Sequence, residues 1–423
     1  MKSDLIIKNA GQLVTCASGG KAKKGSEMQD IGIIEDGSIA VRDGIIVGVG
    51  KTGEILEEFV SENVIDAENM VVCPGFVDPH THIVFGGNRL YEFELRIKGA
   101  SYLEIMEAGG GIVSTVTKTR KASVEELVKS AQVRLNVMLE LGTTSVEIKT
   151  GYGLSKASEI KMLEAIAELD KIHEIDIVPT FLAAHAIPPE WKGKEDEFTN
   201  LICDGMIPAA WDWYESSHFS RQNISSFFID VFCEKNAFNL NQSKKVISTA
   251  KNLGFGIKAH VDEFTNLGCA KFAIEEGATS IDHLDATNDR EVELLAKSET
   301  VGIVTPTVNF NLGSNEFADV RKMIDWGCAM ALSTDYNPGS APCPSQPLTM
   351  AIACRFQKVL PAEAFNAITI NAAYAVGLGE THGSLEVGKQ ADLLILETDD
   401  YRQVAYEFGR NFVKKVVKKG EVL

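Results

Sequence analysis

Two histidines one residue apart, His80 and His82, follow an apolar run in the segment CPGFVDPHTHIVFGGNR, residues 73–89. Side chains alternate across a β-strand, so this spacing places both imidazoles on one side, where they can bind one metal ion. His260 in KAHVDE and Asp335 in STDYNPGS add a third nitrogen and an oxygen. Three nitrogens and one oxygen, with positions left open for water, suit zinc or iron.

Such a centre indicates hydrolysis, because a bound metal ion lowers the pKa of water and polarises a carbonyl group. Hydrolysis of an amide-like C–N bond also requires a base for the proton of water and an acid for the leaving nitrogen. Asp335 can accept a proton as a ligand beside the water, and His283 can orient or deprotonate the nucleophile. Glu263, three residues after His260, is the candidate proton shuttle, and its alternative role is to orient His260.

The positions of these residues predict a (β/α)₈ barrel, a fold of the α/β class. Apolar runs that alternate with helical patterns predict eight strands, at 71–78, 143–149, 176–183, 226–233, 255–260, 279–283, 300–305 and 328–334. The candidate residues fall at the carboxyl ends of these strands, where barrels of this kind place their active sites. The alternative is a doubly wound open sheet, which would need a glycine-rich phosphate loop after its first strand, and none occurs in that context.

The two ends of the chain share a different sequence pattern, in which short β-rich segments are separated by turns that contain glycine and acidic residues. Asp-Gly pairs between the apolar runs of residues 30–72 predict antiparallel hairpins, and the segments after residue 384 look alike. We therefore expect residues 1–72 and 384–423 to form one small β-sandwich-like domain. Residues 73–383 then form the hydrolase barrel, inserted between the two halves of that domain.

The composition fits a globular protein, with 45% hydrophobic residues, 24% charged residues and a formal net charge of −18. This charge disfavours nucleic acids and anionic membranes as partners. The sequence has no segment typical of a secretory signal or a membrane span, which predicts a cytoplasmic protein. The eight cysteines lack metal-site or disulfide-framework spacing, so we expect reduced thiols.

Several longer motifs resemble the imidazolonepropionase family of the amidohydrolase superfamily. They are PGFVDPHTHIVFGGNR, GGGIVSTV, KTGYGL, AAHAIPPE, KAHVDEF, STDYNPGS and the closing GSLEVGKQADLLIL. Enzymes of this family open the ring of 4-imidazolone-5-propanoate with water, which gives N-formimidoyl-L-glutamate in histidine degradation. The resemblance implies a homodimer with one metal ion, zinc or iron, in each site.

The resemblance also implies roles for individual residues. The implied metal ligands are His80, His82, His260 and Asp335. The implied substrate contacts are Arg89, Tyr152, His185, Glu263, Asn337, Gly339 and Ser340. The physical interpretation agrees for Arg89, because a propanoate tail suits a guanidinium group and Arg89 follows the metal pair in a glycine-rich loop.

Two other functions remain open at this point. One is another amidohydrolase, either a cyclic amidase such as dihydroorotase or hydantoinase, or a nucleobase deaminase. Deaminases share the ligand set, but bases lack the carboxylate tail that Arg89 and Tyr152 would receive. A metal-binding scaffold without activity would need neither proton-transfer group.

Some ionisable residues are left out of the predicted site. Lys149 and Lys235 are excluded because a carbamylated lysine bridges two metals, whereas the resembled family is mononuclear. His173, His218 and His382 lie in helix ends or loops, where we expect them to be solvated.

Overall fold

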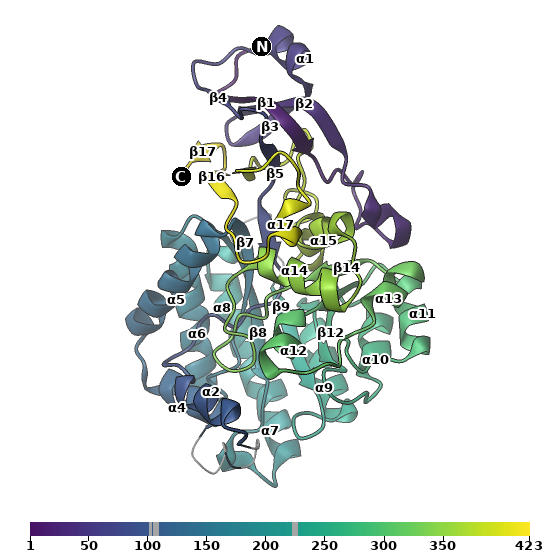
Figure 1. Ribbon diagram of the computed structural model, residues 1–423. Coiled ribbons are helices and arrows are strands. Elements are labelled where there is room, and N and C mark those ends of the chain that lie inside the picture. Colours follow the sequence, from purple (N-terminus) through teal and green to yellow (C-terminus); the bar gives the residue numbers. More distant parts are fainter. Residues whose placement is uncertain (101–103, 105–109, 222–226) are drawn as a thin grey trace.

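The computed structural model, which describes residues 1–100, 104, 110–221 and 227–423, contains a parallel barrel and a second sheet (Figure 1). All pairings in the barrel are parallel, in the order β14-β13-β12-β11-β9-β8-β7-β6, with β10 beside β9. Its strands are β6 (Phe76–Asp78), β7 (Thr143–Lys149), β8 (Asp176–Ala184), β9 (Phe228–Cys233), β10 (Gly256–Ile257), β11 (His260–Val261), β12 (Ser280–His283), β13 (Val301–Val304) and β14 (Met330–Leu332). The predicted (β/α)₈ fold is therefore confirmed.

The barrel closes between its first and last strands just after both have ended. Thr81 and Tyr336 form a parallel bridge, and the His82 amide donates to the Tyr336 carbonyl at 2.9 Å. Because this closure lies beside His80 and His82, the seam of the barrel and the candidate metal ligands are held by the same backbone contacts.

Helices surround the barrel, and their boundaries follow capping residues that the sequence contains. Ser123 caps α5 by accepting from the Glu126 amide at 3.2 Å, and Asn239 caps α9 by accepting from the Gln242 amide at 3.1 Å. The helices of the described residues are α1 (Thr52–Glu58), α2 (Leu90–Ile97), α4 (Ile112–Lys121), α5 (Val124–Glu140), α6 (Lys156–Ile172), α7 (Glu195–Leu201), α8 (Ile207–Ser216), α9 (Leu240–Lys251), α10 (Cys269–Glu275), α11 (Asp289–Lys297), α12 (Pro306–Leu312), α13 (Val320–Asp325), α14 (Gln346–Phe356), α15 (Pro361–Ala367), α16 (Ile370–Ala375) and α17 (Gln403–Tyr406). None of them is both long and apolar enough to cross a membrane.

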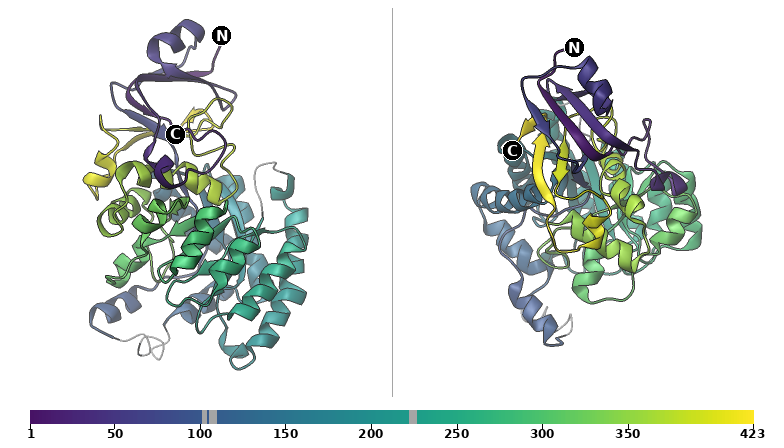
Figure 2. Two further views of the ribbon diagram at one scale, coloured as in Figure 1. Left: turned by 90° about the vertical axis from the view of Figure 1, so that its right-hand side faces the viewer. Right: turned by 45° about the horizontal axis from the view of Figure 1, so that its top comes forward.

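The second sheet, here called the terminal sheet, combines the start and the end of the chain at one side of the barrel (Figures 1 and 2). Its strands are β1 (Leu5–Val14), β2 (Ile33–Arg42), β3 (Ile45–Lys51), β4 (Val64–Asp66), β5 (Val71–Pro74), β15 (Leu393–Leu396), β16 (Val413–Lys418) and β17 (Glu421–Val422). The expected antiparallel arrangement is wrong for the pairing of β4 and β5 with β1, which is parallel, whereas β5 pairs antiparallel with β15. The reason is that α1 returns the chain across the sheet, as a parallel connection requires.

The predicted strand 71–78 is wrong as a single element, because Gly75 divides it between the two sheets. Residues before Gly75 pair with β1 and β15, whereas Phe76–Asp78 pairs with β7. A Cβ atom at Gly75 would lie 2.2 Å from the Thr144 hydroxyl oxygen, so only glycine fits at this crossing. The proposed division of the chain at residue 73 stays a prediction.

His382 differs from the expectation of a solvated histidine, because it is only 2% exposed. Its Nε2 lies 3.0 Å from Asp176 Oδ2 at the start of β8. Lys418 donates to Asp392 at 2.6 Å and also contacts Asp176, so an ammonium group already balances these carboxylates. The cluster is an ion-pair network that joins the terminal sheet to the barrel. All eight cysteines are free, as expected.

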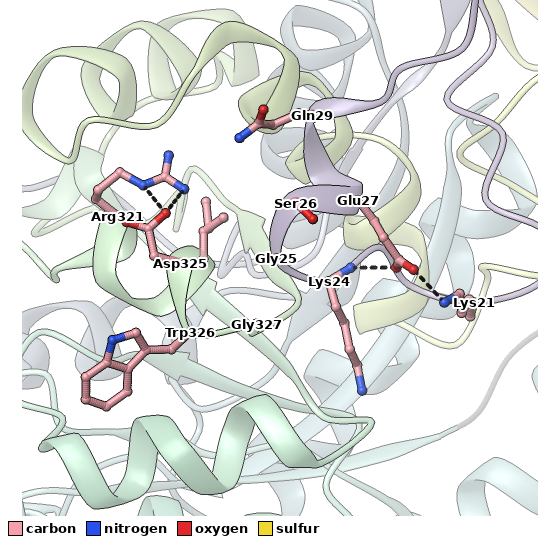
Figure 3. A pocket seen from close by; sticks show the side chains of 11 residues that line it. Lys21, Lys24, Gly25, Ser26, Glu27, Gln29, Arg321, Asp325, Trp326 and Gly327 are labelled. Atoms are coloured by element: carbon pink, nitrogen blue, oxygen red, sulfur yellow. Dashed lines mark hydrogen bonds and ion pairs between the residues drawn. The ribbon is translucent and has the colours of Figure 1, made fainter.

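A cavity of about 500 Å³ lies at the amino-terminal end of β14, away from the predicted site (Figure 3). Its wall carries two ion pairs, Arg321 with Asp325 and Lys21 with Glu27, at distances of 2.7 and 2.8 Å. No histidine lines it. This cavity therefore lacks the residue type that the predicted metal centre requires.

Candidate metal centre and active site

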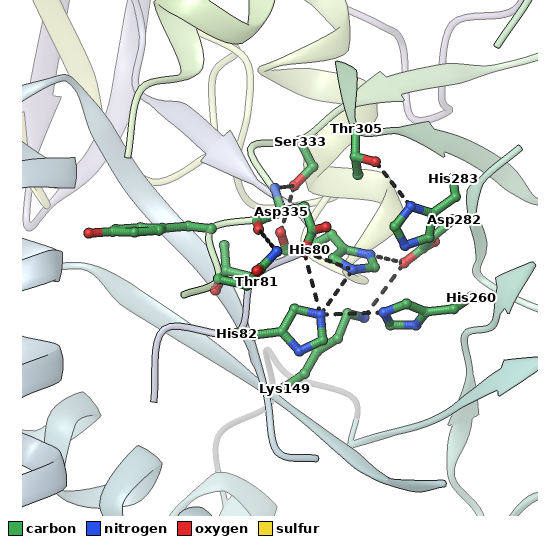
Figure 4. Close-up of polar contacts among 12 residues, drawn as sticks. His80, Thr81, His82, Lys149, His260, Asp282, His283, Thr305, Ser333 and Asp335 are labelled. Carbon is green, nitrogen blue, oxygen red and sulfur yellow. Dashed lines mark hydrogen bonds and ion pairs between the residues drawn. The ribbon is translucent and has the colours of Figure 1, made fainter. Parts of the chain in front are cut away.

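Three imidazole groups converge at the carboxyl ends of the barrel strands (Figure 4). The Nε2 atom of His82 lies 3.3 Å from His80 Nε2 and 3.3 Å from His260 Nε2. Asp335 Oδ1 lies 3.6 Å from His80 Nε2 and 3.5 Å from His82 Nε2. All four side chains are buried, so the structure brings together the four residues that the sequence singled out.

The imidazole Nε2 atoms and Asp335 Oδ1 face one another with no hydrogen-bond donor group of the described residues between them. Asp335 Oδ1 is buried and has no hydrogen-bond partner in the described part of the chain. Burial lowers the pKa of His80 and His82 well below the ordinary value, which keeps both rings neutral. Burial also raises the pKa of Asp335, an effect that a nearby cation would oppose. The residues therefore fit a bound metal ion.

Two carboxylates lie behind the imidazole rings of the candidate ligands, each close to an Nδ1 atom. His80 Nδ1 lies 2.6 Å from Asp282 Oδ2, and His260 Nδ1 lies 2.8 Å from Asp230 Oδ2. A carboxylate at Nδ1 keeps that nitrogen protonated and leaves the Nε2 lone pair free for a metal. The sequence analysis did not identify these residues, although a carboxylate inside a buried apolar strand, as in FIDVFC and SIDH, was a usable signal.

Lys149 stands between these carboxylates. Its fully buried Nζ lies 2.8 Å from Asp230 Oδ2, 2.8 Å from Glu147 Oε1 and 3.5 Å from Asp282 Oδ2. Burial alone would lower the pKa of Lys149, but the three carboxylates raise it above the ordinary value. A charged ammonium group cannot carry a carbamate. Lys235, the other lysine left out of the site, is exposed.

The ends of β6 and β14 are tied together around the ligands. Asp78 accepts from the Thr334 hydroxyl at 2.6 Å and also from the Ser333 hydroxyl. Ser333 in turn contacts the carbonyl of His80 at 2.7 Å. Asp335 itself has a φ of 48°, in the left-handed region that residues with a Cβ rarely adopt. The surrounding hydrogen bonds hold this strained ligand in place.

Glu263 and His283 face each other near the metal ligands, with 4.0 Å between Oε2 and Nε2. Burial raises the pKa of Glu263 well above its ordinary value, and the carboxylates of Asp335, Asp285 and Glu234 add to this effect. Burial lowers the pKa of His283, whose Nδ1 lies 3.1 Å from the Thr305 hydroxyl. Opposite shifts favour a protonated carboxyl beside a neutral imidazole, which is the arrangement of an acid and a base.

Tyr152 and His185 form an aromatic wall beside the ligands. The His185 ring stacks on that of His82, with centroids 5.0 Å apart and an interplanar angle of 14°. Tyr152 lies 5.4 Å from His185 and 5.9 Å from His82 between ring centroids. The Nδ1 atom of His185 lies 3.0 Å from the Gly151 carbonyl, which fixes the orientation of the ring.

Arg89 and the loop after β14 form another side of the site. The Arg89 Nε donates to the Thr115 hydroxyl at 2.9 Å, and its guanidinium lies against Gly339, where a Cβ atom would be 2.2 Å from Nη1. The side-chain oxygen of Asn337 accepts from the amides of Gly339 and Ser340, both at 2.8 Å. The side chain of Asn337 therefore shapes this loop.

Comparison with known proteins places the chain in a family. Models of the amidohydrolase family match residues 63–172 and 237–423. The chain is 51% identical over 420 residues to the imidazolonepropionase of Chloroflexus aggregans, which covers 99% of this chain and 98% of that relative. It is 47% identical over 422 residues to the imidazolonepropionase of Herpetosiphon aurantiacus, covering 100% of this chain and 97% of the relative.

Solved structures confirm the fold at lower identity. An adenosine deaminase from Xanthomonas campestris with bound zinc superimposes with a TM-score of 0.72 at 19% identity, covering 100% of this chain and 93% of the other. Guanine deaminase from E. coli superimposes with a TM-score of 0.70 at 15% identity, covering 99% and 98%. On the strength of the full-length relatives, the chain belongs to the imidazolonepropionase family of amidohydrolases.

Proposed function

We propose that this chain hydrolyses the ring of 4-imidazolone-5-propanoate to N-formimidoyl-L-glutamate, a step of histidine degradation. The observation that carries the proposal is the convergence of three imidazole Nε2 atoms and an unpartnered carboxylate oxygen beside Glu263 and Arg89. The names of the full-length relatives support the same reaction.

One zinc or iron ion would be held by His80, His82, His260 and Asp335. When bound, such an ion makes a water molecule more acidic and polarises a carbonyl group. The geometry fits this set, because each of the three imidazoles directs Nε2 toward the same point. The buried carboxylates at Nδ1 of His80 and His260 keep that orientation.

The residues of the chain then divide the proton transfers between them. Water adds its oxygen to the ring carbonyl carbon, and the bond from that carbon to the ring nitrogen breaks. His283 or Asp335 takes the proton from water, and Glu263 delivers a proton to the leaving nitrogen. Because burial raises the pKa of Glu263, its carboxyl group already holds the proton that it donates.

The substrate would be oriented by groups on the other sides of the site. Arg89 receives the propanoate carboxylate, and Tyr152 donates to the carboxylate or to the ring. His185, whose Nδ1 donates to the Gly151 carbonyl, offers its Nε2 to the ring as an acceptor. Asn337, Gly339 and Ser340 supply the loop along which the tail lies. The Arg89 side chain is 10% exposed, with its Nε 3.8 Å from Glu92 Oε1, so the tail would meet a guanidinium group that is largely shielded from water.

The reaction is tested by following the loss of imidazolone absorbance after metal-replete enzyme is added to freshly generated 4-imidazolone-5-propanoate. We expect rapid ring opening that a chelator abolishes and that added metal restores. Absence of turnover by enzyme that contains its metal would refute the proposed reaction.

The carboxylate receiver has its own test. Arg89→Met should raise KM by at least about 10-fold, because a charged partner of the tail is lost, while metal content stays unchanged. Unchanged kinetics would remove Arg89 from the substrate site.

A further inference from the structure

Two buried glutamates that touch neither the metal ligands nor the proposed substrate surface bind the loops that carry active-site side chains. Glu159 lies in α6 and is 0% exposed, and Glu234 follows β9 and is 4% exposed. We propose that Glu159 is the positioning residue for Tyr152, and that Glu234 is the positioning residue for Glu263. The inference rests on the roles given to Tyr152 and Glu263 in the proposed function.

Glu159 fixes the backbone on both sides of Tyr152. Its Oε2 accepts from the Gly151 amide at 3.0 Å, and its Oε1 accepts from the amides of Gly153 and Leu154 at 2.8 and 2.6 Å. A Cβ atom at Gly153 would lie 2.9 Å from Oε1, so glycine permits this approach. Because one of these contacts precedes Tyr152 and two follow it, the loop cannot shift without breaking hydrogen bonds to a buried carboxyl group.

Glu234 holds the turn that follows Glu263. Its Oε2 accepts from the amides of Phe264 and Thr265 at 2.9 and 3.0 Å, and its Oε1 accepts from the Thr265 hydroxyl. On the other side of Glu263, Asp262 has a φ of 57°, which is unfavourable for a residue with a Cβ. A strained residue precedes Glu263 and a bound segment follows it, so the contacts of Glu234 offset the strain of the turn.

A carboxylate suits the binding of main-chain amides because both of its oxygens accept hydrogen bonds. A side-chain amide has one accepting oxygen and one donating NH₂ group. Glutamine at either position would turn an NH₂ group toward main-chain N–H donors and break at least one contact. A displacement of a catalytic group by about 1 Å can cost up to ~100-fold in rate. The two loops carry different functions, so the two changes should alter different kinetic constants.

The experiment compares Glu159→Gln and Glu234→Gln in the metal-replete, full-length enzyme acting on 4-imidazolone-5-propanoate. We expect Glu234→Gln to lower kcat by about 10-fold or more with KM nearly unchanged, because the proton shuttle is misplaced. We expect Glu159→Gln to raise KM by about 10-fold with kcat nearly unchanged, because substrate anchoring is weakened. Metal content should match that of the natural chain in both.

The matched control is Glu363→Gln. Glu363 is also 0% exposed and accepts from a main-chain amide, that of Leu360, at 2.8 Å, but its ion-pair partner at 2.7 Å is Arg321, which lines the cavity of Figure 3. This variant should lower the melting temperature without changing either kinetic constant. Where a glutamine variant does not fold, Glu159→Asp and Glu234→Asp keep the charge on a shorter side chain and should show the same split, reduced in size.

Amide hydrogen exchange provides a readout that does not depend on turnover. Peptides that cover residues 150–155 should exchange faster in Glu159→Gln only, and peptides that cover residues 261–266 should exchange faster in Glu234→Gln only. The inference would be overturned if both variants changed kcat and KM in the same way. It would also be overturned if amide exchange became faster throughout the barrel. If the variants show these exchange patterns but the metal-replete natural chain shows no turnover, the proposed function would be refuted instead.

Discussion

Replacement of Asp282 by asparagine tests whether the carboxylates behind the ligands control metal binding. Asp282 Oδ2 accepts from His80 Nδ1 at 2.6 Å, and its Oδ1 accepts from the Ser280 hydroxyl at 2.6 Å. Asparagine can keep both contacts, with its oxygen toward His80 and its NH₂ group toward the Ser280 hydroxyl. The change therefore removes a charge and leaves the packing intact.

The expected loss follows from the difference between charged and neutral hydrogen bonds. A bond to a charged acceptor contributes ~1.5–3 kcal/mol and a neutral one ~0.5–1.5 kcal/mol, so the change costs about 1.5 kcal/mol. Every ~1.4 kcal/mol is a factor of ten, so the metal dissociation constant should rise about 10-fold or somewhat more. This lies within the ~10–100-fold range found for partners of metal-binding histidines.

The assay is the zinc dissociation constant, measured by competition with a chromogenic chelator at fixed pH. Asp392→Asn is a matched control, because Asp392 is a buried aspartate that contacts Lys418 in the terminal sheet. Zinc affinity within twofold of the natural chain for Asp282→Asn, or an equal loss for Asp392→Asn, would refute the reasoning.

Three further outcomes are expected. Gly339→Ala should raise KM about 10-fold, because the new Cβ would lie 2.2 Å from Arg89 Nη1 and displace the guanidinium by more than ~1 Å, so an unchanged KM contradicts the proposed tail site. Glu263→Gln should retain metal while kcat falls by ~10²–10⁴, whereas loss of metal would make Glu263 a support of the ligands. Burial raises the pKa of Asp285 to about 7. Between pH ~4 and ~7 the folded chain thus keeps a proton that the unfolded chain releases, and the stabilisation from this group is lost as the pH rises. Asp285→Asn should therefore be more stable relative to the natural chain at pH 8 than at pH 5.5, as measured by thermal unfolding, and an equal difference at both values would contradict the shift.

The strands of the barrel could be predicted from the sequence because each is a short apolar run that ends in polar residues. The runs that end near Lys149, Cys233 and His283 agree with β7, β9 and β12. The convergence of His80, His82, His260 and Asp335 could be predicted from the same pattern, since the carboxyl ends of parallel strands meet at one edge. Their role as metal ligands stays a prediction. The apolar runs and the common edge of parallel strands were therefore sufficient to predict which side chains lie together.

The partners of the ligands could not be predicted in the same way. The contact of His80 with Asp282 joins residues that are 202 positions apart, and it depends on how far each strand extends past its neighbours. The contacts of Glu159 and Glu234 depend on loop backbone amides, which carry no sequence signature of their own. His382 was misjudged because its burial comes from the docking of the terminal sheet on the barrel.

At Gly75 the chain passes from β5 of the terminal sheet to β6 of the barrel, so a protein shortened to this point would lack part of the terminal sheet. β5 lies between β1 and β15, so a fragment that began at Gly75 would keep the pairing of β15 with β16 but would lose β5 from the other edge of Leu393–Leu396. These four residues are buried and apolar. A barrel produced without the start of the chain would expose an apolar edge strand with unpaired backbone N–H and C=O groups. We expect this shortened protein to aggregate rather than remain monomeric.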